Sequence, residues 1–268
     1  MEQQGPLGLA QQINASTREG HDVVNRLIMS RLALGLQDHT LYREGLLSFA
    51  FVFKTFEEEW ASLMSSSSNI DPRIKTILQN LYSTPLLRTP QLTKDLLYYF
   101  GSTPFSTEAP TTIQRTAYVA HIRQVVAEKP HLLISYAYIY YMALFAGGKI
   151  VKYQMGKAKD FFPERYGMTE EERYTAGTNL FSFEVEQGKE EGLRTSFKGA
   201  LSDLEGTLTV EERNDIIEES KAIFANNVLI IKELDQICSY LVATSPSMSV
   251  KMASRMSDRP LVEFIHSE

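Results

Sequence analysis

The chain has 268 residues, 43% of them hydrophobic, which is enough to bury a large core. Its net charge of −6 gives no basic excess, so we expect no binding to nucleic acid. The single cysteine, Cys238, excludes an internal disulfide and a cysteine-rich metal cluster, and it fits a reducing compartment.

Apolar residues recur at helical spacing along the first half of the chain, and the alternation typical of strands is rare. The first two helices are predicted over residues 7–36 and 40–60, before a serine-rich connector at 65–69. Asp71 is predicted to cap a third helix, with Pro72 at its first position. A fourth helix is expected from Thr89 to about Phe100, followed by a loop over 101–110.

The second half continues the helical pattern. Helices are predicted over residues 112–128, 130–159, 186–204 and 210–243, the last one opened by a capping box formed by Thr209 and Glu212. Residues 166–178 are expected to form a polar connector, and 180–183 a short apolar insert. About eight helices and essentially no sheet predict one compact all-α domain over residues 1–244. A polar tail follows at 245–268.

Two adjacent glycines, Gly147 and Gly148, lie inside the helix predicted over 130–159. Each costs about 0.5–1 kcal/mol relative to alanine in a helix interior. Such a pair indicates that the backbone must approach something closely or bend locally. A kink, or a tight contact between two helices, is the simpler alternative.

Five histidines are present: His21, His39, His121, His131 and His266. None has a histidine partner at the spacing of a zinc site, and no intact helix has the Glu-x-x-His pairs of a di-iron site. No nucleophile elbow supports a serine hydrolase. A heme iron needs only one protein ligand, which is most often histidine. A lone histidine such as His21, however, is more often a surface or packed residue.

Several segments in the same order extend this argument. They are His21, Arg43-Glu44-Gly45, Glu57-Glu58-Glu59, residues 132–138 followed by Gly147-Gly148, residues 180–183, and residues 204–205 with 217–224. Together they resemble the heme oxygenase family over about residues 9–241. The resemblance implies a heme-oxygenase-like helical fold.

The resemblance also implies a set of site residues. His21 is expected to be the axial iron ligand, and Gly147 and Gly148 the distal glycines that let the backbone lie against the porphyrin and the bound oxygen. Cations that bind the two propionates, and side chains that line the pocket, are expected at Arg18, Arg194, Lys198, Tyr138, Phe224 and Asn227. Without the resemblance, Arg194 and Lys198 would be assigned to a solvated helix face, paired with Glu190 and Glu191.

One departure from the family pattern concerns proton supply. Many heme oxygenases have Gly-Asp-x-Ser-Gly-Gly on the distal helix, and here the aspartate position is Leu144 and the serine position is Ala146. Leucine neither donates nor accepts a hydrogen bond. This form resembles the fungal type of the family. Protons would then come by another route, through waters held by backbone carbonyls or by Tyr138, Tyr140 or Tyr141, or oxygen activation would be poor.

The resemblance implies an enzyme that opens heme to biliverdin and releases iron and carbon monoxide. Heme is then both substrate and cofactor, oxygen is the oxidant, and NADPH supplies electrons through a flavoprotein reductase. A non-catalytic heme-binding or heme-sensing protein on the same fold is the main alternative. The protein is expected in the cytoplasm, or at the cytosolic face of the endoplasmic reticulum if a longer natural chain has a membrane anchor.

Overall fold

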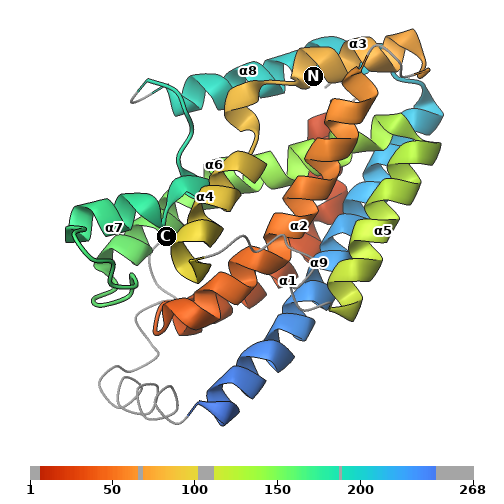
Figure 1. Cartoon of the computed structure of the whole chain (residues 1–268). Helices are drawn as coiled ribbons and strands as arrows, with labels where there is room; N and C mark the ends of the chain where they lie inside the picture. The colour runs from red at the N-terminus through yellow and green to blue at the C-terminus, as the bar shows by residue number, and fades with distance from the viewer. Residues whose placement is uncertain (1–6, 66–68, 102–111, 187–188, 246–268) are drawn as a thin grey trace, which may run out of the picture.

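The computed structural model describes residues 7–65, 69–101, 112–186 and 189–245, and most of them are helical (Figure 1). These residues form no strand, which confirms the predicted all-α class. The helices are α1 (Leu9–Gly35), α2 (His39–Met64), α3 (Pro72–Leu81), α4 (Thr89–Phe100), α5 (Ile113–Glu128), α6 (Leu133–Lys157), α7 (Glu170–Ala176), α8 (Glu190–Leu204) and α9 (Val210–Thr244). Four 3-10 turns lie between them, η1 (Thr84–Leu86), η2 (Pro130–Leu132), η3 (Asn179–Phe181) and η4 (Glu205–Thr207).

Local signals in the sequence explain where several helices begin. The Asp71 carboxylate accepts a hydrogen bond from the Arg73 backbone N–H at 2.8 Å, with Pro72 in the first turn of α3. The Thr209 hydroxyl accepts from the Glu212 N–H at 3.1 Å, while the Glu212 carboxylate accepts from the Thr209 N–H at 2.7 Å. Both predicted caps are confirmed.

The polar connector predicted over 166–178 is wrong in part, because it contains helix α7. A second capping box, between Thr169 and Glu172, opens this helix, and none of its residues is buried. An apolar stripe is therefore missing, and only the caps indicate this helix in the sequence. The helix predicted from residue 186 begins at Glu190 instead.

The core lies where α2 meets α6. Phe56 and Trp60 on α2 pack against Tyr136, Tyr140 and Tyr141 on α6, and all five side chains are buried. The rings of Phe56 and Tyr140 are stacked, with centroids 5.7 Å apart. These contacts fix α6 in the centre of the molecule.

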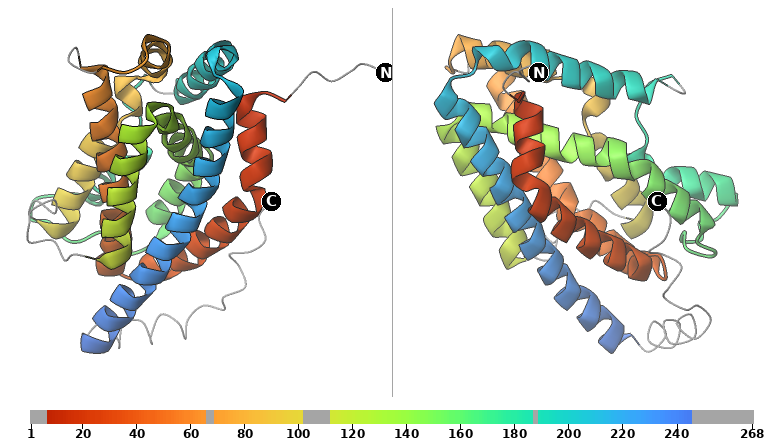
Figure 2. Two further views of the ribbon diagram at one scale, coloured as in Figure 1. Left: turned by 90° about the vertical axis from the view of Figure 1, so that its right-hand side faces the viewer. Right: turned by 180° about the vertical axis from the view of Figure 1, so that it is seen from behind.

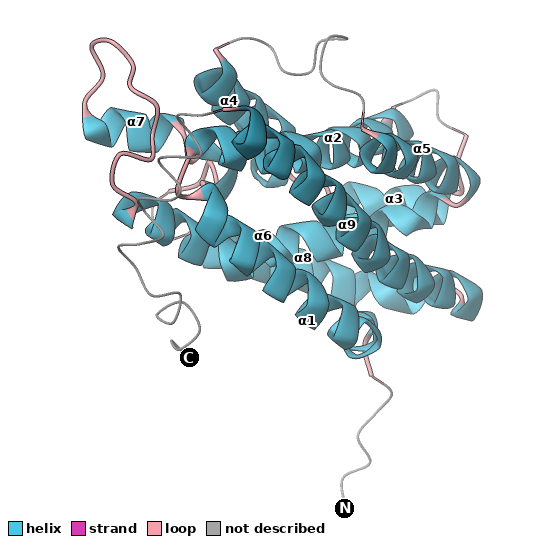
Figure 3. Ribbon diagram, turned by 90° about the horizontal axis from the view of Figure 1, so that it is seen from below, coloured by secondary structure: helices cyan, strands magenta, loops and turns pink. Residues whose placement is uncertain are grey.

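The remaining helices surround this core. α9 runs along α1 on one side and packs against α5 on another, while α3 and α8 lie across one end (Figures 1 and 2). Seen from below, α9 crosses the bundle obliquely (Figure 3). Among the described residues, no helix combines the length and apolar character that a membrane crossing requires. The polar tail predicted at 245–268 lies outside the described residues, except for Ser245.

Candidate functional site

His21 lies near the middle of α1, and its side chain is 63% exposed. Its Nδ1 is 3.5 Å from the Asp22 carboxylate, and its ring meets the Phe224 ring edge-on at 6.1 Å. At the preceding position, Gly20, a Cβ would stand 2.9 Å from the Phe224 Cβ. The missing side chain therefore lets α1 approach α9 closely beside His21. The sequence prediction did not include Gly20, although a glycine inside a helix next to the candidate ligand was an available signal.

α1 and α6 meet through a polar contact near the start of each helix. The Tyr138 hydroxyl on α6 donates a hydrogen bond to the Asn14 side-chain oxygen on α1 at 3.2 Å. Asn14 precedes His21 by two helical turns and so shares its face of α1. His21 is therefore on the side of α1 that is directed towards α6. Beyond this crossing the two helices run apart (Figure 2). The sequence prediction also did not include Asn14.

The two glycines of α6 have different surroundings. A Cβ at Gly147 would meet no atom within 4 Å, whereas a Cβ at Gly148 would lie 3.3 Å from the Phe181 ring. Ala143 and Ala146, beside Gly147, are exposed. α6 therefore has an open face of small residues at Gly147 and a packed face at Gly148. The backbone at Gly148 is in close contact with Phe181, so only Gly147 offers a backbone open to a ligand.

α9 connects the neighbourhoods of His21 and Gly147. The Tyr140 hydroxyl on α6 donates to the Asn227 side-chain oxygen at 2.7 Å. Tyr140 precedes Gly147 by two turns on the same face of α6, and Phe224 precedes Asn227 by about one turn. Phe224 and Asn227 are both buried, at 9% and 4% exposure. The open face of α6 thus borders α9 next to the Phe224 side chain that touches His21.

The three predicted cations lie on the two helices that flank this region. Arg18 is exposed, one turn before His21. Arg194 pairs with Glu191 at 3.0 Å, and its charge lowers the pKa of Tyr138, while the larger effect of burial raises it. Lys198 is exposed one turn after Arg194. The Arg194–Glu191 pair agrees with the solvated-face alternative, whereas the proximity to Tyr138 places Arg194 near the crossing of α1 and α6.

Leu144 and Ala146 offer no polar side-chain atom on α6, and nearby tyrosines already hold acceptors. Tyr140 donates to Asn227, and Tyr141 donates to Glu57 at 3.1 Å. Burial raises the pKa of both hydroxyls well above the usual tyrosine value. Neither tyrosine is therefore a ready acid at neutral pH, so a proton would have to pass through water on this side of α6.

The side chains present fit heme better than a metal ion alone. No group of three histidine, cysteine or carboxylate side chains within the described ranges could hold a metal. One exposed imidazole, an open face of small residues and three cations are what an iron porphyrin with two propionates requires. His21, Gly147, Arg18, Arg194 and Lys198 are the residues that could hold it.

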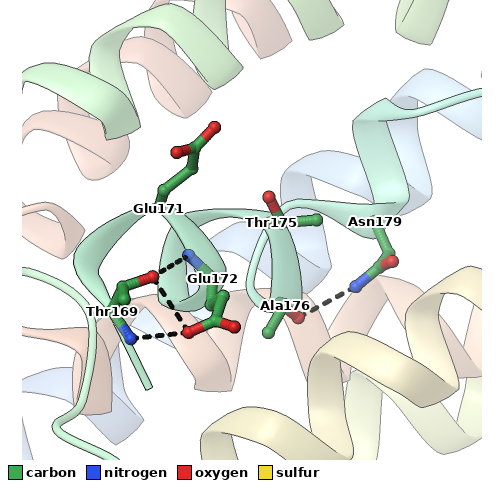
Figure 4. A pocket seen from close by; sticks show the side chains of 6 residues that line it. All are labelled: Thr169, Glu171, Glu172, Thr175, Ala176 and Asn179. Carbon is green, nitrogen blue, oxygen red and sulfur yellow. Dashed lines mark hydrogen bonds between the residues drawn. The ribbon is translucent and has the colours of Figure 1, made fainter.

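A separate open depression lies on α7, lined by Thr169, Glu171, Glu172, Thr175, Ala176 and Asn179 (Figure 4). The Thr169 and Glu172 side chains are occupied by the capping box of α7 itself. None of the predicted site residues lines this depression, so it is not part of the candidate site.

Comparisons with known proteins agree with this arrangement. The heme oxygenase family model matches residues 7–233. The heme-binding protein HMX1 of Saccharomyces cerevisiae is 27% identical over 242 residues, covering 85% of this chain and 76% of that protein. Heme oxygenase 1 of Synechocystis is 26% identical over 230 residues, covering 85% of each.

Solved structures show the same fold. The structure of heme oxygenase 2 from Chlamydomonas reinhardtii without heme has a TM-score of 0.71 at 23% identity, covering 84% of this chain and 97% of that one. Heme oxygenase-1 from Synechocystis in complex with heme has a TM-score of 0.68 at 24% identity, covering 88% and 98%. The helical arrangement and the family match over most of the chain lead to one conclusion: the chain belongs to the heme oxygenase family.

Proposed function

We propose that this protein opens heme oxidatively to biliverdin and releases iron and carbon monoxide, with oxygen as oxidant and with electrons that a reductase takes from NADPH. The observation that most supports this is the pairing of an exposed imidazole on α1 with an open, glycine-containing face on α6. Heme, when bound, supplies the oxygen chemistry, and the protein supplies orientation and protection.

His21 has the role of iron ligand in this proposal. Its Nδ1 faces the Asp22 carboxylate, and a proton held there leaves the Nε2 lone pair for iron. Arg18, Arg194 and Lys198 are proposed to bind the propionates, because charge-assisted hydrogen bonds are strong where water is partly excluded. Gly147 is proposed to let the α6 backbone approach the opposite face of the porphyrin.

A heme-binding protein without turnover is the second candidate. Leu144 and Ala146 favour it, since neither side chain can hold a water that delivers protons. The similar yeast protein is itself described as heme-binding. In the proposed enzyme, which would resemble the fungal type of the family, water bound to backbone carbonyls on the open face of α6 replaces the missing carboxylate.

The two candidates separate in a reduction assay. Purified protein is loaded with hemin, then a reductase, NADPH and catalase are added, and the Soret band is followed in air. Loss of the band with formation of biliverdin supports the enzyme, and a heme band that persists supports the binder. His21→Ala serves as the ligand control, and we expect it to remove the six-coordinate ferric spectrum of the wild type. An unchanged spectrum would exclude His21 as the ligand.

A further inference from the structure

Three charged side chains are buried on the side of α6 that faces away from the open face. Glu57 is 6% exposed, and Arg88 and Asp95 are fully buried. Burying a charge costs several kcal/mol unless hydrogen bonds compensate for the lost water. Their contacts show what these charges hold in place.

Arg88 joins the start of α4 to residues 178–184, which we call the aromatic segment. Its guanidinium donates to four backbone carbonyl oxygens, those of Pro85, Leu86, Leu180 and Ser182. It also lies over the Phe183 ring, 4.3 Å from the ring centroid. Since two of these acceptors and the ring belong to the aromatic segment, this one side chain holds the segment at three places.

Asp95 holds the other end of the aromatic segment. Its carboxylate accepts hydrogen bonds from the backbone N–H groups of Asn179 at 2.8 Å and Leu180 at 2.7 Å, and from the Asn179 side chain at 2.8 Å. Glu57 fixes the start of α4, because its carboxylate accepts from the Arg88 and Thr89 N–H groups. Arg88 and Asp95 are therefore held on one rigid helix end.

The aromatic segment packs against the face of α6 opposite the open one. The Phe181 ring lies 3.3 Å from the Cβ position of Gly148, and Phe183 stacks on Phe145 with centroids 4.4 Å apart. The Lys152 ammonium donates to the Ser182 hydroxyl at 2.7 Å. The contacted positions of α6, Phe145, Gly148 and Lys152, form one stripe at helical spacing.

We propose that Arg88 and Asp95 are positioning residues for the substrate face of α6. They press the aromatic segment against Gly148, and this contact fixes how far the Gly147 backbone projects towards the heme and which porphyrin edge it favours. Neither residue touches the substrate. The proposal rests on the proposed function for its substrate, but the position of α6 is testable without heme.

The first test is hydrogen–deuterium exchange of the ligand-free full chain, comparing Arg88→Met and Asp95→Asn with the wild type. We expect exchange in residues 143–152 to become at least about tenfold faster, while peptides from α1 stay unchanged. Arg73→Met is the control, because Arg73 pairs with Glu212 at the end formed by α3 and α8, and its loss destabilises the protein elsewhere. Unchanged exchange in 143–152, or an equal increase in the control, overturns the proposal.

The second test uses the hemin complex. We expect the Arg88→Met and Asp95→Asn proteins to shift the ferric Soret band and to yield a mixture of biliverdin isomers where the wild type yields one, with Arg73→Met unchanged. If exchange rises but spectrum and isomer ratio stay as in the wild type, positioning of the substrate is excluded. If the wild type takes up no hemin, the proposed function fails, and the exchange result still decides whether α6 depends on these residues. Should Arg88→Met not fold, Asp95→Asn alone gives the same readouts.

Discussion

The two sides of the candidate site are stabilised by different interactions. On the α1 side, His21 is exposed, and the helix is held to α9 by close packing at Gly20 and by a bidentate Arg31–Asp235 pair. On the α6 side, Gly147 belongs to a helix that is buried against α2 and supported from behind by buried charges.

This difference has a consequence for binding. Helix α6 cannot shift without breaking hydrogen bonds to buried charged groups, whereas α1 can shift by repacking apolar contacts and a half-exposed ion pair. We therefore infer that the glycine face is the fixed reference of the site, and that adjustment to a ligand takes place mainly in α1.

The largest expected effect is on the α6 side. Glu57→Leu leaves the Arg88 N–H, the Thr89 N–H and the Tyr141 hydroxyl without their acceptor, and we expect it to lower the free energy of unfolding by about 3–5 kcal/mol. Glu58→Leu is the matched control, because Glu58 is 50% exposed and pairs with Lys54 at the surface, so its loss should cost less than about 1 kcal/mol. Equal costs in urea unfolding would show that buried charges do not support α6.

The next effect is a pH dependence caused by Asp95. Burial raises the pKa of this carboxyl to about 6 in the folded protein, against a model value of 3.8. The folded state therefore binds more protons between these values, so the free energy of unfolding falls as the pH rises from 4 to 7, by about 2–3 kcal/mol. Urea unfolding of the wild type relative to Asp95→Asn isolates this group, and a difference that does not vary with pH contradicts the assignment.

A smaller effect is expected on the α1 side. Gly20→Ala places a methyl group against the Phe224 Cβ, which is fixed to the α9 backbone, so the two helices must separate. We expect a loss of about 1–2 kcal/mol despite the better helix propensity of alanine, together with weaker hemin binding as His21 moves. Thermal unfolding and hemin titration measure both. A variant at least as stable as the wild type would mean that Gly20 does not limit the approach of α1.

The smallest effect distinguishes the two glycines. Gly147→Ala meets no atom within 4 Å, so the ligand-free protein should gain about 0.5–1 kcal/mol from helix propensity while hemin affinity falls. Gly148→Ala should gain less, because the Phe181 ring must yield. Thermal unfolding without ligand and hemin titration test the pair, and identical behaviour of both variants would exclude separate roles.

The amino-acid sequence by itself determined the helical class and most helix boundaries. Apolar periodicity and caps such as Asp71 and Thr209 act within a few residues, so they are readable from the chain alone. Helix α7 was missed because it buries no residue. The order of the motifs from His21 to residue 224 indicated the family, which the match over residues 7–233 then showed.

Only the tertiary structure decided which glycine is open and which is packed. Gly147 and Gly148 are neighbours with the same local sequence, and the difference arises from Phe181, which reaches Gly148 from another segment. Likewise, nothing local marks Arg88 or Asp95 as buried, since their partners lie about 90 residues away along the chain. Contacts at such separations form only when helices pack, because packing is what compensates the cost of burying their charges.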